Sequence, residues 1–192
     1  MLILASKSPR RKDILQGLGL EFECKSPVVD ESFPPNVEPS MLVRELAIRK
    51  AEAVEIENPR DLVISADTIV YHRGRILGKP RNEDDALVML RLLSGEAHTV
   101  YTGFAIRSMY KTVCDFCATD VYFRNLDDEE ILNYIKTGEP MDKAGAYGIQ
   151  GLGALLVDRI EGDYLNVVGL PASSLMVSLR ENFGFDYYGN KK

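Results

Sequence analysis

Histidine and cysteine are both scarce in this chain of 192 residues. The three cysteines, Cys24, Cys114 and Cys117, make an odd number, and the start of the chain is expected to be a strand rather than a secretion signal, so reduced thiols are favoured over a disulfide framework. Cys114 and Cys117 have the spacing of half a zinc site, but no second pair follows, and His72 and His98 are the only histidines. A structural zinc site is therefore not expected.

Long apolar runs and nucleotide-binding glycine motifs are missing as well. The longest apolar stretches, such as residues 62–66 and 154–157, fall far short of the roughly 20 residues that a membrane span requires, so we expect no contact with a membrane and a cytoplasmic location. No GxxxxGK[ST] motif occurs, and the glycines at 148, 151 and 153 have the reverse of the dinucleotide spacing, which disfavours P-loop and Rossmann enzymes. A net charge of −6 disfavours nucleic-acid partners, so any phosphate site should be local.

The patterns that are present alternate between strand and helix, which predicts an α/β fold with a mixed, twisted sheet and flanking helices. We expect a single domain over residues 1–192, built as two lobes, with a flexible tail at 187–192. Strands are predicted at 1–6, 62–70, 75–77, 98–107, 113–124, 154–160 and 164–168. Helices are predicted after Ser8, over 41–56, after Asn82, after Asp127 and from Pro171, with irregular loops at 30–39 and 142–153.

The first predicted helix begins with Arg10, Arg11 and Lys12, although cations are disfavoured at the positive end of a helix by roughly 0.3–1 kcal/mol each. A bound phosphate would compensate, since free backbone amides, two guanidinium groups and the hydroxyls of Ser6 and Ser8 could converge on one anion. The alternative interpretation is a basic helix start that faces solvent.

A second candidate is Asp67, which directly follows the apolar run of a predicted interior strand, where α/β proteins often place active sites. Its carboxylate could act as a general base or hold a hard cation such as Mg²⁺, with Glu31 as a second carboxylate. A purely structural capping role for Asp67 explains the pattern equally well. Lys50 and Lys79 are less specific candidates, because most lysines are only solvated.

Four segments together carry a family resemblance: LILASKSPRRKDIL at the start, VISADTIV at 63–70, LGKP at 77–80 and EPMDKAGAYGIQGLGALLV at 139–157. In this order and spacing they resemble the Maf family of nucleotide pyrophosphatases, and the resemblance extends to VVGLP at 167–171. It implies a fold similar to that of inosine triphosphate pyrophosphatases, two lobes around a cleft and a homodimer. The implied reaction is hydrolysis of a nucleoside triphosphate to the monophosphate and pyrophosphate.

The resemblance also assigns roles to individual residues. The family's proton acceptor falls on Asp67, while its phosphate-binding loop falls on Ser6, Ser8, Arg10 and Arg11. Further polar residues of the family's site correspond to Glu31, Lys50, Lys79, Asp142 and Lys143. A departure from many relatives is Ser65, which stands where they have glycine.

Three positions separate two branches of the family, and here they are Arg10, Thr68 and Gln150. This set resembles the branch that acts on dTTP and UTP, whereas the branch acting on 7-methyl-GTP tends to have Trp, Gln and Glu. A glutamine amide can accept from the N3–H of uracil and donate to its O4, whereas a glutamate can only accept. The resemblance therefore implies a pyrimidine nucleotide as the small-molecule substrate.

The expected mechanism has Asp67 activating water for attack on the α-phosphorus. Mg²⁺, or Mn²⁺, is the expected cofactor, and together with the cluster of Arg11, Lys50 and Lys79 it stabilises charge on the leaving pyrophosphate. Asp67 is a general base, a metal ligand or both, and Glu31 can exchange roles with it. The rival interpretation is a regulator of cell division and septum formation that binds the nucleotide without hydrolysing it, although the presence of both Asp67 and Lys79 favours an enzyme.

Overall fold

The structure is a computed structural model that describes residues 1–34 and 36–188. Of the tail predicted at 187–192, residues 189–192 lie outside the described residues. The strands are β1 (Leu2–Ala5), β2 (Phe22–Lys25), β3 (Leu62–His72), β4 (Arg75–Leu77), β5 (Ala97–Arg107), β6 (Thr112–Phe123) and β7 (Val157–Glu161). The helices are α1 (Pro9–Gly17), α2 (Pro39–Glu52), α3 (Glu83–Leu93), α4 (Asp128–Lys136), α5 (Tyr164–Val168) and α6 (Ala172–Phe183), with 3₁₀ helices η1 (Glu139–Asp142), η2 (Ala144–Ala146) and η3 (Gly151–Leu156).

The strands form one seven-stranded sheet in the order β2-β1-β3-β5-β6-β7, with β4 paired to β3. β1 runs parallel to both β2 and β3, whereas the β3–β4 and β6–β7 pairs are antiparallel. The sheet is therefore mixed and carries helices beside it, which confirms the predicted fold class. β2 was not predicted, although residues 20–25 alternate apolar and polar as a strand requires; the strand has only four residues, and its side chains are exposed or half-buried.

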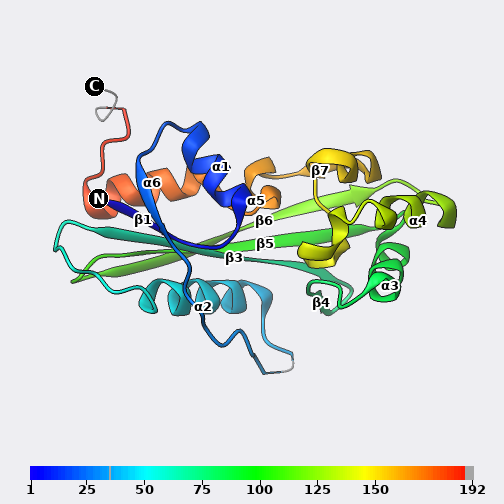
Figure 1. Cartoon of the computed structure of the whole chain (residues 1–192), viewed down its shortest axis with the longest axis horizontal. Coiled ribbons are helices and arrows are strands. Elements are labelled where there is room, and N and C mark those ends of the chain that lie inside the picture. Colours follow the sequence, from blue (N-terminus) through cyan, green and yellow to red (C-terminus); the bar gives the residue numbers. More distant parts are fainter. Residues whose placement is uncertain (35, 189–192) are drawn as a thin grey trace. The chain divides into compact units, whose positions relative to one another are not determined.

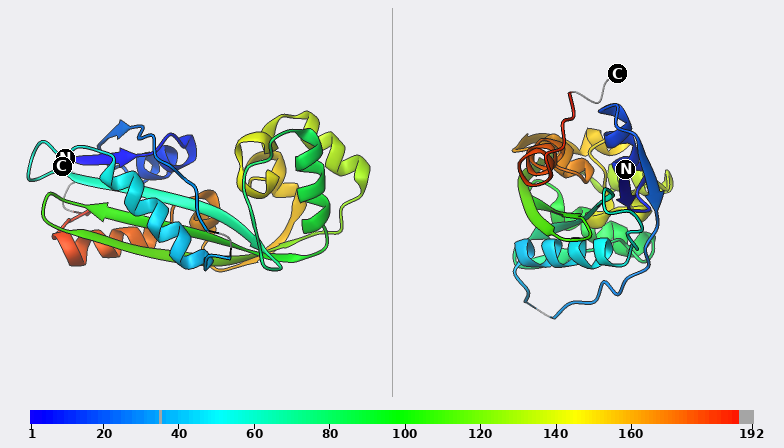
Figure 2. Two further views of the ribbon diagram at one scale, coloured as in Figure 1. Left: turned by 90° about the horizontal axis from the view of Figure 1, so that it is seen from below. Right: turned by 90° about the vertical axis from the view of Figure 1, so that its left-hand side faces the viewer.

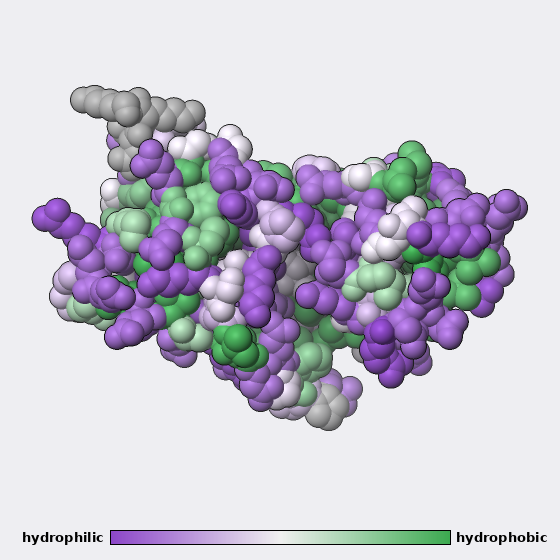
Figure 3. All heavy atoms as spheres, viewed as in Figure 1, coloured by the Kyte–Doolittle hydropathy of each residue, from purple (hydrophilic) through white to green (hydrophobic). Residues whose placement is uncertain are grey.

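The chain divides into two compact units. Unit 1 comprises residues 1–67, 102–117 and 169–192, and unit 2 comprises residues 68–101 and 118–168. The long strands β3, β5 and β6 contribute residues to both units. No helix of the described residues is both long and apolar enough to cross a membrane. In the face drawn in Figure 3 most surface residues are hydrophilic, and the hydrophobic ones lie in separate small patches.

Unit 1 has helices on both faces of its strands. Leu2 and Leu4 of β1 pack with residues of α1 and α6, whereas Ile3 and Ala5 pack with residues of α2, as the alternation of a strand requires. Accordingly, α2 lies on one face of the strands, and α1 and α6 lie on the other (Figures 1 and 2). Gly103 of β5 allows the close approach of α2, because a Cβ atom there would overlap the backbone of Val43.

Unit 2 has its own hydrophobic core. This core combines the apolar faces of α3 and α4 with the ends of β3, β5 and β6 that belong to the unit, and with the 139–156 segment (Figure 2). Both helices begin as predicted, since Asn82 accepts a hydrogen bond from the Asp85 amide and Asp127 accepts one from the Glu130 amide. Tyr147 of the 139–156 segment is 4% exposed, so this segment is partly core rather than a free loop.

Two strand predictions were wrong. Residues 154–156 belong to the 3₁₀ helix η3, and β7 begins only at Val157. Residues 164–168 form the short helix α5 instead of a strand. Asp163 starts this turn by accepting a hydrogen bond from the Leu165 amide, and the buried Asn166 side chain donates to the Val100 carbonyl, so local capping and a tertiary contact override the β-branched composition.

Candidate active site

Lys50 joins two acidic side chains in unit 1. Its Nζ atom lies 2.5 Å from an oxygen of Asp67 and 2.7 Å from an oxygen of Glu31. The side chains of Lys50 and Asp67 are 14% and 12% exposed, whereas that of Glu31 is 61% exposed. The structure therefore brings together three of the predicted residues in a charged cluster that is shielded on one side and open on the other.

Packing of α2 against β3 places the two most buried members of this cluster. The hydroxyl of Ser65, on β3, donates to the carbonyl of Ala47, on α2, over 2.6 Å, and both residues are fully buried. Asp67 lies two residues beyond Ser65, and Lys50 lies three residues beyond Ala47, so this bond fixes the register that lets Lys50 reach Asp67. The serine that departs from the family pattern thus takes part in building the site.

Glu31 comes from a segment without regular structure, and Arg49 holds that segment. One guanidinium nitrogen of Arg49 donates to the carbonyls of Asp30 and Ser32, on either side of Glu31, over 3.2 and 3.1 Å. Its Nε donates to Glu45 one turn earlier on α2. Sequence reasoning missed Arg49, because only its position next to Lys50 hinted at a role.

Arg11 is buried at the start of α1. Its Nε donates to the Gly169 carbonyl over 2.7 Å, and another guanidinium nitrogen donates to Ser6 Oγ over 3.3 Å. Burial lowers the pKa of Arg11 from its usual value, while the nearby Asp67 carboxylate opposes this shift by stabilising the charged form. Arg11 is therefore a fixed cation of the interior of unit 1 and not a basic residue that simply faces solvent.

The loop before α1 follows the prediction in part. Ser8 occupies the N-cap position and its amide donates to Ser6 Oγ over 3.1 Å, but within the described part of the chain its hydroxyl makes no capping hydrogen bond. Pro9 is the first helical residue, and no acidic residue lies in the first turn of α1. Arg10 follows in that turn and is half-buried, and its charge also lowers the pKa of Arg11. The positive character predicted for this helix start is present.

The donor chemistry of the unit 1 cluster suits a hard divalent cation. Among residues 1–34 and 36–188, no group of three or more histidine, cysteine, aspartate or glutamate side chains could hold a metal ion. Mg²⁺, however, is commonly bound by one or two carboxylates together with substrate phosphates and waters. Asp67 and Glu31 fit that pattern, and the Lys50 ammonium group lies between them, in contact with one oxygen of each.

Three further predicted residues belong to unit 2. Thr68 directly follows Asp67 in β3 and is half-buried, whereas Lys79 and Gln150 are exposed. The segment after β4 is joined to η2, since the Gly145 amide donates to the Gly78 carbonyl, next to Lys79, over 3.0 Å. The structure therefore places these three residues in unit 2.

The 139–153 segment contains the remaining predicted residues. Lys143 Nζ donates to Asp142 over 2.7 Å and to the Glu139 carbonyl over 2.5 Å, so both predicted residues help to fold their own segment. The segment is also held by Glu139 and Tyr134, which sequence reasoning missed. Glu139 stands inside the EPMDKAG motif itself, which was the available signal.

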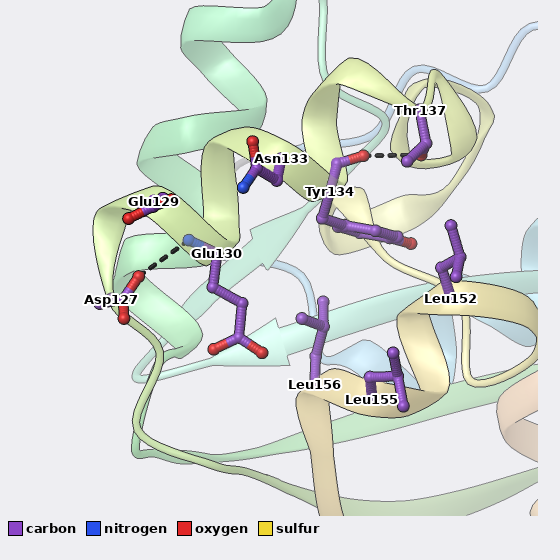
Figure 4. Close-up of a pocket in the computed structure, with 9 residues that line it drawn as sticks. All are labelled: Asp127, Glu129, Glu130, Asn133, Tyr134, Thr137, Leu152, Leu155 and Leu156. Atoms are coloured by element: carbon purple, nitrogen blue, oxygen red, sulfur yellow. Dashed lines mark hydrogen bonds between the residues drawn. The ribbon is translucent and has the colours of Figure 1, made fainter.

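A pocket of about 490 Å³ lies in unit 2 between α4 and η3. Figure 4 shows the acidic side chains of α4 on one side and three leucines of η3 on another. Of the nine residues that line it, none is a predicted site residue. The predicted chemistry therefore does not coincide with this pocket.

Fold and site together define an α/β protein whose charged cluster is suited to phosphate chemistry. The family model described as Maf-like protein matches residues 1–182. A dTTP/UTP pyrophosphatase of Alkaliphilus oremlandii (strain OhILAs) is 52% identical over 185 residues, which are 95% of this chain and 96% of that protein. Proteins of the same name from Thermoanaerobacter sp. (strain X514) and Geobacillus sp. (strain WCH70) are 50% and 53% identical, covering 95% and 90% of this chain and 96% and 92% of their own lengths.

The chain belongs to the Maf family. The match spans nearly the whole chain and includes all four motifs that carried the resemblance. The predicted family is therefore confirmed, and the similar proteins bear the name of the predicted pyrimidine branch.

Proposed function

We propose that this protein hydrolyses dTTP and UTP to the nucleoside monophosphate and pyrophosphate. The observation that carries the proposal is the cluster of Asp67, Glu31 and Lys50 beside the buried Arg11, in a chain about half identical to named dTTP/UTP pyrophosphatases. Carboxylates and cations in one partly shielded place are what phosphoryl chemistry requires, since catalysis depends on positioning and on charge stabilisation.

In the proposed reaction, the oxygen of a water molecule bonds to the α-phosphorus while the bond from that phosphorus to the α,β-bridging oxygen breaks. Asp67 accepts the proton of the attacking water, and pyrophosphate leaves with the bridging oxygen. Lys50 already forms ion pairs with both Asp67 and Glu31, so incoming phosphate oxygens compete with these carboxylates for its ammonium group. Arg11 and Lys79 stabilise negative charge on the phosphates.

The family suggests a divalent metal requirement, and we propose Mg²⁺ with Asp67 and Glu31 as its protein ligands. When bound, the ion would neutralise phosphate charge. Ser6, Ser8 and Arg10 complete the proposed phosphate-binding residues, while Thr68 and Gln150 contribute to base selection. We further propose a cytoplasmic homodimer that does not bind nucleic acid.

The test is a screen of nucleoside triphosphates with Mg²⁺, in which pyrophosphate and orthophosphate are measured separately. We expect pyrophosphate from dTTP and UTP at higher kcat/KM than from CTP, GTP or 7-methyl-GTP. Release of orthophosphate would place the cleavage at another bond and contradict the proposed reaction. Tight binding of dTTP without turnover would instead support a regulator.

A further inference from the structure

Gln150, the proposed base-reading residue, lies in the stretch 147–150, which has no helix or strand, immediately before the 3₁₀ helix η3. The backbone is extended at Gln150, with φ −99° and ψ 166°, and then turns sharply at Gly151, where φ is +65°. The side chain is exposed. A residue in this situation is oriented only as well as the backbone on either side of it is held.

The Glu139 carboxylate holds the backbone that follows Gln150. Glu139 Oε1 accepts a hydrogen bond from the Gly153 amide over 2.9 Å, and Oε2 accepts one from the Leu152 amide over 3.1 Å. Burial alone would raise the pKa of Glu139, but the hydrogen bonds from the two amides and from Tyr134 hold it below its usual range. The ionised group, which can accept all three bonds at once, is thus the favoured form.

Tyr134 holds the backbone that precedes Gln150. Its hydroxyl donates to Glu139 over 3.0 Å and accepts a hydrogen bond from the Gly148 amide over 3.3 Å. Figure 4 shows this side chain extending from α4 toward the segment that carries Leu152. Tyr134 is 5% exposed and belongs to the core of unit 2, so its side chain is held by packing on several sides.

The glycines of the segment fit this arrangement. A Cβ atom at Gly153 would come within 2.6 Å of the Tyr134 hydroxyl and would overlap the Gly148 carbonyl. A Cβ atom at Gly151 would come within 2.9 Å of a Glu139 carboxylate oxygen. The glycine spacing that fails as a dinucleotide motif therefore serves a close approach of the backbone to Glu139 and Tyr134.

We infer that Glu139 and Tyr134 are positioning residues that set the base selectivity of the enzyme by fixing the backbone on both sides of Gln150. This inference rests on the proposed function. Neither residue needs to touch the substrate, since their hydrogen bonds end on the backbone of residues 148, 152 and 153 and on each other. Loosening them lets the Gln150 amide present either of its ends to the base, which favours CTP relative to UTP.

The experiment compares Glu139→Gln and Tyr134→Phe with the wild type and with Glu129→Gln, a control at an exposed position on α4. Glutamine keeps the shape of glutamate but turns an NH₂ donor toward one of the two backbone amides. Phenylalanine keeps the buried ring and removes only the hydroxyl. We expect the UTP to CTP ratio of kcat/KM to fall about 3- to 10-fold in both variants and to stay unchanged in the control.

Hydrogen exchange at the amides of Leu152 and Gly153, and the midpoint of thermal unfolding, are measured on the same variants. Faster exchange together with a lower ratio supports the inference. Faster exchange with an unchanged ratio overturns it, because these residues would then be only structural, and so does unchanged exchange in Glu139→Gln. A wild type that releases no pyrophosphate from UTP removes the proposed function and the inference with it, whereas an active wild type with unaffected variants removes the inference alone.

Discussion

The two units hold their predicted site residues by different means. In unit 1 the charged side chains contact each other directly, as Lys50 does with Asp67 and Glu31. In unit 2 the exposed Gln150 depends on backbone amides that a carboxylate and a tyrosine hold in place. We infer that changes in unit 1 act mainly on the chemical step, whereas changes in unit 2 act mainly on the choice of base.

The largest effect is expected for Asp67→Asn. Asparagine keeps an oxygen that can accept from Lys50 but loses the basic carboxylate, so kcat for dTTP should fall about 10²- to 10⁴-fold with little change in KM or in the unfolding midpoint. Steady-state kinetics at several Mg²⁺ concentrations check this. Recovery of activity as Mg²⁺ rises would identify Asp67 as chiefly a metal ligand. An unchanged kcat would remove it from the chemistry.

Arg11→Ala should have the next largest effect. The loss of a charged hydrogen bond to the phosphates is expected to reduce transition-state stabilisation by about 1.5–3 kcal/mol, which lowers kcat/KM roughly 10- to 150-fold. Because Arg11 also donates to the Gly169 carbonyl, the unfolding midpoint should drop as well. Arg11→Lys is the matched variant, since it keeps the charge but not the planar geometry. If Arg11→Ala lowers stability but leaves KM and kcat alone, Arg11 is only structural.

Gln150→Glu tests unit 2 directly. A carboxylate facing uracil O4 brings two acceptors together, so kcat/KM for UTP should fall by about 1–3 kcal/mol, or roughly 5- to 150-fold, with a smaller loss for 7-methyl-GTP. The comparison requires UTP, dTTP, CTP and 7-methyl-GTP in both proteins. Equal losses for all four nucleotides would mean that Gln150 does not read the base.

Stability of unit 2 should depend on pH through His98. This side chain is 3% exposed and lies 2.7 Å from the Tyr147 hydroxyl, and burial, with a smaller effect of His72, lowers its pKa to about 3. The unfolded chain therefore binds one more proton between about pH 6.5 and 3, so stability falls as the pH falls through that window, by about 2 kcal/mol at pH 5. Denaturant unfolding at pH 7.5 and 5 should show this slope in the wild type and a flatter one in His98→Phe. Equal slopes would exclude His98 as the cause.

Local sequence signals predicted much of the fold. The helix starts at Pro9, after Asn82 and after Asp127 were all correct, because proline and capping side chains act within one turn. The error at α5 had two causes: the local cap by Asp163 was overlooked, and the bonds of Asn166 to Val100 and Thr119 join residues far apart in sequence. The hydrophobic periodicity of a segment does not predict such long-range hydrogen bonds.

The candidate site also combines residues that local sequence signals predicted with residues whose role depends on contacts between distant segments. Asp67 and Arg11 stood out as charges in unusual sequence positions, and the structure places both in the buried part of unit 1. The groups that hold the site residues were missed, because Arg49, Tyr134 and Glu139 act on backbone atoms of other segments. Residue type predicts the chemistry of a side chain, but only the folded chain shows which loop it supports.

The smallest effect is expected for Arg49→Ala, which tests whether the segment carrying Glu31 must be held in place for Mg²⁺ binding. Its side chain is 36% exposed, and its guanidinium group donates to the carbonyls on both sides of Glu31. Arg49→Ala should therefore release the segment that carries Glu31 and leave the Lys50–Asp67 pair intact. Loss of roughly 1 kcal/mol corresponds to about a fivefold rise in the Mg²⁺ concentration needed for half-maximal rate, with kcat at saturating Mg²⁺ nearly unchanged. Arg44→Ala, on the same helix but bonded to the Ser40 carbonyl, should leave the Mg²⁺ dependence unaltered. A Mg²⁺ titration of both variants distinguishes the possibilities. If the Mg²⁺ concentration for half-maximal rate rises equally in both variants, the effect comes from lost positive charge on α2. If it changes in neither variant, Glu31 is not a metal ligand and the chemistry of unit 1 depends on Asp67 alone.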